Sequence, residues 1–155
     1  MENSIEMMVR RWCEIDGSRF WYRDGKPHRD GGPAVILANG TQLWYRDGEH
    51  HREDGPAVIL ANGTQLWYRD GEHHREDGPA VMMADGSQFW YFNGEIHRDD
   101  GPAAIWANGD QEWYRDGELH REDGQALIKP DGTEEHWQHD RRVIKNDKET
   151  PSARM

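Results

Sequence analysis

The sequence predicts an all-β fold, an elongated tandem array of β-hairpins in 23-residue repeats that stack into a twisted sheet or solenoid. Residues 33–55 read PAVILANGTQLWYRDGEHHREDG, and residues 56–78 repeat this stretch at all 23 positions. Short β-prone runs alternate with turn signals at the same spacing, and no helical period of comparable strength is present. We therefore expect a chain of similar units, each of which contacts only its neighbours.

The repeats divide the chain into three parts. The repeat register runs without insertion or deletion from Gly17 to Gly132, which is five steps of 23 residues. We expect residues 1–16 to form an N-terminal cap, as a short strand or a turn of helix, because the outer neighbour of a terminal repeat is water. Residues 17–137 are predicted to form five and a half repeats. Residues 138–155 are expected to form a C-terminal cap and a polar tail.

Each repeat is predicted to contain a hairpin. In the unit 33–55, the β-prone run 34–38 precedes Asn39–Gly40, and residues 42–46 follow as the return strand. Asn-Gly between two such runs predicts a two-residue type I′ turn, in which glycine supplies a positive φ.

Two further turn signals complete the unit. Asp47–Gly48 and the run 51–55, a His-Arg-acid-x-Gly pattern, recur at 23-residue spacing along the chain, with Asn in place of Asp once. Because side chains alternate along a strand, Tyr45 is predicted on one face and Trp44 and Arg46 on the other.

The composition predicts a thin, repeated core. Hydrophobic residues are only 34% of the 155 residues, and the mean hydropathy is -1.13, values that by themselves are typical of disorder. However, eight Trp and five Tyr recur at fixed positions in the repeats, and each can bury a large area. A core that is one repeat deep and many repeats long reconciles the two observations.

The net charge limits the partners. Nineteen Lys and Arg against 30 Asp and Glu give a formal charge of -11, which disfavours direct binding of nucleic acid. An acidic surface suits a basic protein, including one that itself binds nucleic acid, although acidity also serves simply to keep an array in solution. Cys13 is the single cysteine and no long apolar run is present, so we expect a cytoplasmic protein with no membrane partner.

The repeat unit resembles a known family. Its pattern, W-Y-x-[DN]-G-x-x-H-R-x-x-G-P-A, is similar to the MORN-like and YwqK-like hairpin repeats, and more closely to the arrays of phages and large viruses built on WYxNGxxHRxDGPA. The resemblance covers about residues 17–137. It implies a hairpin array that acts in protein interaction, and an antitoxin-like role. Ordinary MORN units have more glycine and a different aromatic spacing.

The His-Arg-acid runs offer groups for acid–base or metal chemistry, yet they favour a structural role. An active site is normally one constellation, whereas His51 and its neighbours recur five times. Equivalent histidines one repeat apart are expected to lie about 10 Å from each other, which is too far to share one zinc ion. We therefore expect no catalytic residue, no cofactor and no metal. Arginine and aspartate side chains are expected to bridge neighbouring repeats and to bond loop backbone groups.

The candidate partner-binding residues are the aromatic, arginine and acidic positions of the central repeats. A row of exposed aromatics and arginines makes a good interface, while the same aromatics are also needed for packing. A second hypothesis is a nucleotide sponge that stacks bases on the aromatics. The open edge strands also allow a homodimer. The candidate site comprises Trp44, Arg46, Glu53, Asp54, Trp67, Arg69, Glu76, Asp77 and Trp90.

The unbroken repeat register leads to the first prediction. Deletion of residues 56–78 is expected to leave a folded, shorter protein, because contacts pass only between neighbours. Deletion of about half a repeat is expected to unfold the chain, because it breaks the alternation of strand and turn. Circular dichroism with thermal melting distinguishes the two. Equal unfolding of both variants would contradict the array.

Overall fold

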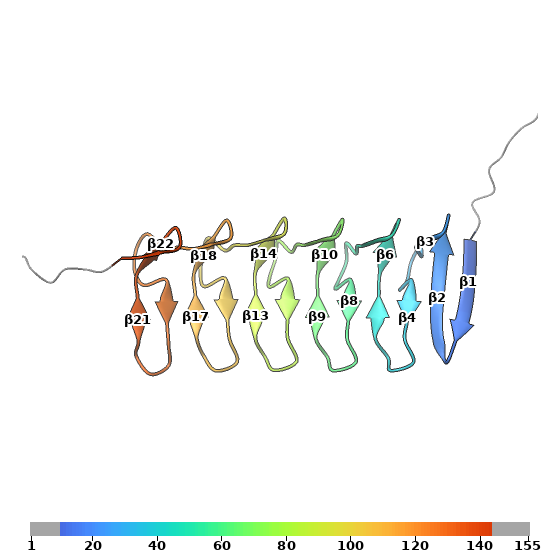
Figure 1. The fold of residues 1–155 in the computed structure, drawn as a ribbon, viewed down its shortest axis with the longest axis horizontal. Coiled ribbons are helices and arrows are strands. Elements are labelled where there is room, and N and C mark those ends of the chain that lie inside the picture. Colours follow the sequence, from blue (N-terminus) through green and yellow to red (C-terminus); the bar gives the residue numbers. More distant parts are fainter. Residues whose placement is uncertain (1–9, 144–155) are drawn as a thin grey trace, which may run out of the picture.

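The structure, a computed structural model that describes residues 10–143, confirms the all-β tandem array. Twenty-three strands and no helix occur in this range. Figure 1 shows one long row of strands with a second row of small hairpins along one side of it. The predicted caps lie partly outside the described residues, since 1–9 and 144–155 are not described. Within the N-terminal cap, Arg10–Ile15 forms a strand rather than a helical turn.

A 13-stranded antiparallel sheet runs the length of the array. Its strands follow each other as β1-β2-β4-β5-β8-β9-β12-β13-β16-β17-β20-β21, and β3 pairs with β2 beside this path. Each repeat thus contributes two hydrogen-bonded strands. The strands of the sheet are β1 (Arg10–Ile15), β2 (Ser18–Arg23), β3 (Lys26–Pro27), β4 (Val35–Ile36), β5 (Gln42–Leu43), β8 (Val58–Ile59), β9 (Gln65–Leu66), β12 (Val81–Met82), β13 (Gln88–Phe89), β16 (Ala104–Ile105), β17 (Gln111–Glu112), β20 (Leu127–Ile128) and β21 (Glu134–Glu135).

Five two-stranded hairpins form the second row. They pair β6 with β7, β10 with β11, β14 with β15, β18 with β19 and β22 with β23. Neighbouring hairpins are joined through the backbone, as where Gly71 N donates to His50 O at 3.0 Å. The strands are β6 (Tyr45–Arg46), β7 (Glu49–His50), β10 (Tyr68–Arg69), β11 (Glu72–His73), β14 (Tyr91–Phe92), β15 (Glu95–Ile96), β18 (Tyr114–Arg115), β19 (Glu118–Leu119), β22 (Trp137–Gln138) and β23 (Arg141–Arg142).

The predicted return strand 42–46 is divided at Trp44. Its first part, β5, pairs with β4 and β8 in the long sheet, and its second part, β6, pairs only with β7. Trp44 belongs to both rows, since its N–H donates to Ala57 O at 2.7 Å and its carbonyl accepts from His51 N at 3.2 Å. The chain therefore exchanges its hydrogen-bond partners at Trp44, where it leaves the long sheet and begins the hairpin.

The turn assignment from sequence was wrong in one respect. The type I′ turn lies at Asp47–Gly48, where both residues have positive φ, 53° and 92°, and Arg46 pairs with Glu49. At Asn39–Gly40 only the glycine has positive φ, and Leu37 N donates to Thr41 O. That loop is therefore a three-residue connection that ends in a left-handed glycine.

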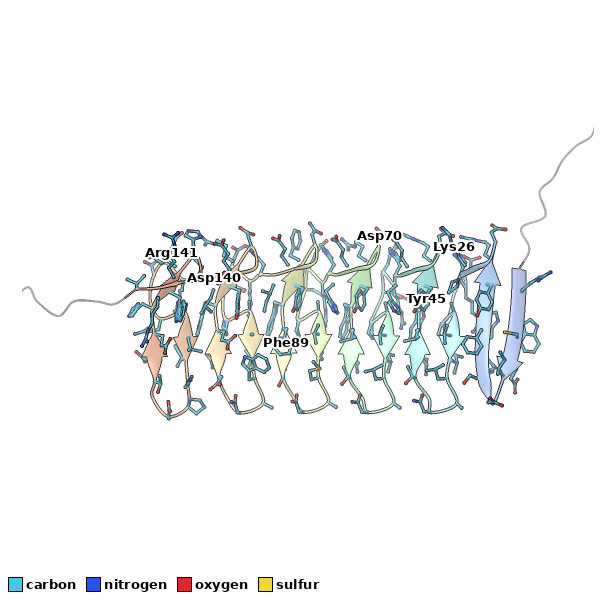
Figure 2. All side chains as sticks on the ribbon, in the orientation of Figure 1. Lys26, Tyr45, Asp70, Phe89, Asp140 and Arg141 are labelled. Carbon is cyan, nitrogen blue, oxygen red and sulfur yellow. The ribbon has the colours of Figure 1, made fainter. Side chains whose placement is uncertain are left out.

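The core between the two rows contains a column of stacked rings. Tyr45 lies there (Figure 2) and stacks on His50 with ring centroids 4.1 Å apart. The column continues through Tyr68 and His73 to Tyr91. Beneath it, equivalent alanines are fully buried at each repeat, which lets the backbone of the long sheet approach closely: Ala34, Ala57, Ala80, Ala103 and Ala126.

The histidines of this column predict a loss of stability in acid. Burial lowers the pKa of His50 and His73, partly offset by backbone hydrogen bonds to Trp44 and Trp67. The unfolded chain then binds more protons than the folded one once the pH falls below the ordinary histidine pKa of about 6.5. The stability contributed by the neutral rings is complete above that pH, and it is lost as the pH falls towards the lowered pKa.

The test replaces the two rings by the residues that later repeats place there. Ile96 and Leu119 pair with Tyr91 and Tyr114 as His50 pairs with Tyr45. We expect the melting temperature of the parent to fall between about pH 7.5 and about pH 5.5, and that of His50→Ile/His73→Ile to fall less. Identical slopes in the two proteins would contradict this account.

Candidate functional site

Three adjoining grooves lie along the side of the array where the His-Arg-acid loops emerge. Their volumes are about 590, 640 and 630 Å³. The first groove is bounded by the loops 28–32 and 51–54, the second by the loops 52–56 and 74–77, and the third by the loops 75–78 and 97–100. We call this surface the groove face, and the loops between grooves its walls.

The groove face collects the nine residues predicted from sequence. Trp44, Arg46, Glu53 and Asp54 line the first groove. Trp90 lines the third groove. The second groove is lined by the same four positions of the next repeat: Trp67, Arg69, Glu76 and Asp77. Simple alternation does not account for the placement, because the strand is divided at Trp44 and Tyr45 lines the first groove as well.

The tryptophan of each Trp-Tyr pair is covered by an arginine eight residues further along the chain. The Arg52 guanidinium carbon lies 4.2 Å from the Trp44 ring centroid, and the same stack recurs at Trp21, Trp67, Trp90 and Trp113 at 3.9–4.2 Å. The guanidinium also ion-pairs with Asp54 at 3.0 Å and donates to Pro56 O at 3.2 Å. The indole rings are therefore half-buried packing elements, with part of each ring open to its groove.

Gly55 makes this stack possible. A Cβ on Gly55 would lie 3.0 Å from the Arg52 guanidinium carbon, and the same distance applies at Gly78 and Gly101. The φ angles at these three positions are not in the left-handed region. At Gly55, Gly78 and Gly101 the absence of a side chain therefore leaves room for an arginine, a role that the sequence interpretation missed.

Carboxylates form the outer rim of the groove face. The Asp54, Asp77 and Asp100 side chains are 85–86% exposed, whereas their partners Arg52, Arg75 and Arg98 are only 23–25% exposed. The arginine hydrogen bonds lower the pKa of all three aspartates, so these groups are ionised at neutral pH. A molecule that approaches the walls meets negative charge first.

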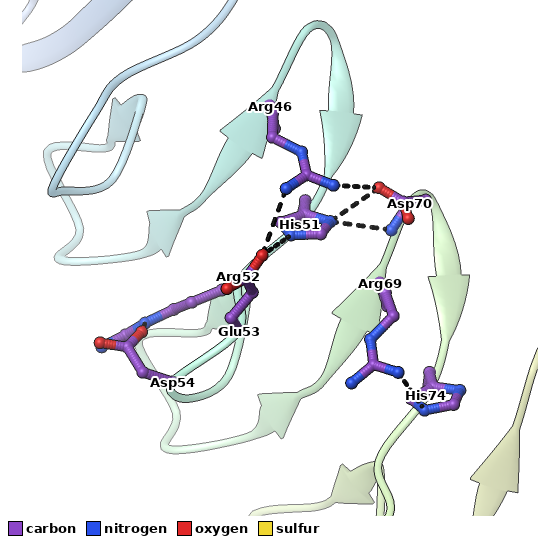
Figure 3. A network of polar contacts seen from close by, with 8 residues as sticks. All are labelled: Arg46, His51, Arg52, Glu53, Asp54, Arg69, Asp70 and His74. Carbon is purple, nitrogen blue, oxygen red and sulfur yellow. Dashed lines mark hydrogen bonds and ion pairs between the residues drawn. The ribbon is translucent and has the colours of Figure 1, made fainter.

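A different set of contacts joins neighbouring repeats. Arg46 pairs with Asp70 of the next repeat at 2.6 Å, and His51 Nδ1 accepts from Asp70 N at 3.1 Å (Figure 3). Equivalent bonds of His28, His74, His97 and His120 repeat along the array. The expectation that arginine and aspartate bridge repeats is confirmed for Arg46 and Asp70. For the loop pair Arg52 and Asp54 it is wrong, since their ion pair lies within one loop.

The arginine–aspartate pairs of this set stop in the middle of the array, whereas the histidine bonds continue to His120. Asn93 stands where Asp47 and Asp70 stand in earlier repeats, and Arg69 instead contacts Glu76 at 3.0 Å. Phe92 replaces the arginine of the next step and stacks against the His74 ring at 4.8 Å. The third groove consequently has an exposed aromatic ring where the first two have a cation.

Several residues that line the groove face are not identified by the sequence analysis. Arg52, Arg75 and Arg98 were considered only as part of the His-Arg-acid runs, and Asp99 and Asp100 were left out. One signal was available, because an arginine follows each tryptophan of the pair after eight residues in all five repeats. Residues eight apart on a continuous strand are too far from each other to touch. The contact between the arginine and the tryptophan therefore becomes apparent only in the folded structure.

The comparisons add no family assignment. No protein-family model matches the chain, and no curated protein matches it. Residues 10–143 contain no group of three or more His, Cys, Asp or Glu side chains arranged to hold a metal ion. The described part of the chain also has no helix of the length and apolarity needed to cross a bilayer.

The arginine stack gives a prediction that separates two roles of glycine. Gly55→Ala is expected to destabilise the protein by about 1–3 kcal/mol, because the new methyl group meets the Arg52 side chain. In an Arg52→Ala background most of that loss is expected to disappear.

Gly40→Ala is the matched control. Gly40 has φ 91° and no atom within 4 Å of an added Cβ, so its cost of about 1–2 kcal/mol comes from the backbone alone. That cost is expected to be the same with and without Arg52. Chemical denaturation of the single and double variants measures how far the cost of each glycine substitution depends on Arg52. A Gly55→Ala cost that is independent of Arg52 would contradict the packing role.

Proposed function

We propose that the protein is a non-enzymatic interaction module whose groove face binds a basic protein. The observation that carries the proposal is the arrangement of charge on the walls, where exposed carboxylates project beyond half-buried arginines. Because equivalent carboxylates recur at every repeat, their fields add along the array instead of cancelling. A basic protein would be steered towards this face, and nucleic-acid phosphates would be repelled.

The concrete form of the proposal is a phage-type inhibitor of a bacterial defence system, or an antitoxin-like neutraliser, that acts in the cytoplasm. Its partner would be a basic defence protein that normally binds nucleic acid. The resemblance of the repeat to phage, large-virus and YwqK-like arrays supports this form. The two identical repeats, 33–55 and 56–78, also support it, because a unit that duplicates readily suits an evolving binding surface.

A nucleotide sponge is the alternative from a different class. Base stacking needs a free ring face, and the chain's own arginines already cover one face of Trp44, Trp67 and Trp90. A base would have to use the remaining part of the ring, next to walls rimmed with carboxylates that repel its phosphate. The charge of the walls therefore favours the protein partner.

The test compares two variants that each remove three negative charges. The groove variant, Glu53→Gln/Glu76→Gln/Asp99→Asn, changes the walls. The outer variant, Glu49→Gln/Glu72→Gln/Glu95→Gln, changes exposed positions in β7, β11 and β15 that line none of the three grooves. Both sets are exposed to solvent, so little effect on stability is expected.

Affinity capture from a nuclease-treated bacterial lysate, followed by kinetics with the purified partner, is the measurement. We expect basic proteins to be retained by the parent and the outer variant and lost by the groove variant. The association rate is expected to fall about tenfold from low to physiological salt. A rate that ignores salt, together with equal capture by all three proteins, would show that the wall carboxylates are not the binding groups.

A further inference from the structure

The grooves form one continuous surface along the array axis. Residues 52–54 line both the first and the second groove, and residues 75–77 line both the second and the third. A ligand that spans the groove face therefore crosses successive walls rather than entering isolated pockets. At each wall it meets the same pair of exposed acidic positions: Glu53 and Asp54, Glu76 and Asp77, Asp99 and Asp100.

The walls are evenly spaced because each repeat adds two strands to the long sheet. The strand order β4-β5-β8-β9-β12-β13 contains no interruption between repeats. With hydrogen-bonded neighbours ~4.8 Å apart, successive walls lie about 9.6 Å apart. The groove face thus presents negative charge at a fixed interval, and a partner that places cations at the same interval engages every wall at once.

Among regular polypeptide conformations, polyproline II matches this interval. It has three residues per turn and a rise of 3.1 Å, so every third side chain returns to the same side after about 9.3 Å. A β-strand returns a side chain to the same face after about 6.7 Å, so its cations would miss successive walls and come near a wall only at about every second one. An α-helix repeats its face at about 5.4 Å, and two turns overshoot the spacing by about 1.2 Å at every wall.

The groove floors favour the same conformation. Trp44, Trp67 and Trp90 are half-buried on the floors and recur at the wall spacing. Grooves lined by aromatic rings are a common way to bind polyproline II segments, whose rings pack against indoles and whose backbone is already ordered before binding. Prolines between the cations would therefore lie over the tryptophans.

His51 offers a hydrogen bond to such a ligand. Its side chain is 93% buried and lines the first groove, and its Nε2 atom has no hydrogen-bond partner among the described residues. Nδ1 lies 3.1 Å from Asp70 N and 2.9 Å from Asp70 Oδ1, and in the tautomer in which Nδ1 accepts from Asp70 N the ring proton is on Nε2. The Glu53 carboxylate is 3.6 Å from Nε2, beyond hydrogen-bond distance. Polyproline II leaves its backbone carbonyls without internal partners, so a ligand carbonyl suits this donor.

Resting on the proposed function, we infer that the partner is bound through an extended polyproline II segment with Lys or Arg at every third residue. The segment lies along the array, and each cation sits at one wall. This goes beyond an acidic face that attracts a basic protein, since it specifies the conformation of the bound segment and the spacing of its charges.

The probes are two synthetic peptides of identical composition, KPPKPPKPPK and KKKKPPPPPP, titrated into the full-length protein by calorimetry. We expect the spaced peptide to bind about tenfold more tightly, because it forms exposed ion pairs at several walls and the clustered peptide at one. The groove variant is expected to lose this preference, and the outer variant, which has the same net charge, is expected to keep it.

Equal affinity of the two peptides, or a preference for the clustered one, overturns the inference while leaving a charge-driven function intact. Failure of both peptides to bind also overturns it. A preference for the spaced peptide that survives in the groove variant would show that the walls do not read the spacing. Salt-dependent capture of basic proteins tests the proposed function separately, so the two failures are distinguishable.

Discussion

The shape of the groove face depends on an arginine side chain held between an indole ring and a glycine. Arg52 lies over Trp44, and Gly55 leaves the space that the guanidinium occupies. The contact folds the loop 51–55 back onto the point where the strand leaves the long sheet. It also places a cation beneath the surface and leaves its carboxylate partner outside. Packing and surface charge are therefore set by one contact, which recurs in all five repeats.

Much of the fold could be predicted from sequence because the repeats are regular. The identity of residues 33–55 and 56–78 fixes a periodic structure. Alternation along 42–46 is observed only in part, since Tyr45 stacks on His50 but also lines the first groove with Trp44. The division of that strand at Trp44 could not be predicted, because it depends on which neighbour each backbone group bonds. The turn at Asn39–Gly40 shows a similar limit, since a dipeptide signal does not reveal the number of residues in the loop.

The site residues that lie on strands could be predicted from sequence, whereas the contacts made by loop residues could not. Trp44 and Arg46 are two residues apart and are predicted on one face, and both line the first groove, but the presence of Tyr45 there does not follow from alternation. Arg52 reaches Trp44 only after the chain has turned twice, and a glycine that reads as a turn signal, Gly55, is in fact a packing position. The bridging role of His51 likewise requires the next repeat to be in place.

Departures from the repeat give the groove face a direction. The first groove has three arginines against three carboxylates, the second has three against four, and the third has two against four. The first step arises because Gly31 stands at the position of Asp54 and Asp77, and the second because Phe92 takes the place of an arginine. The arginine–aspartate pairs between repeats also end near Phe92. Net negative charge therefore increases from the first groove to the third, and the third alone adds an exposed phenyl ring. An array of identical grooves would have no electrostatic preference for either end of a charged segment. This one favours the orientation in which the more cationic end of the segment lies in the third groove.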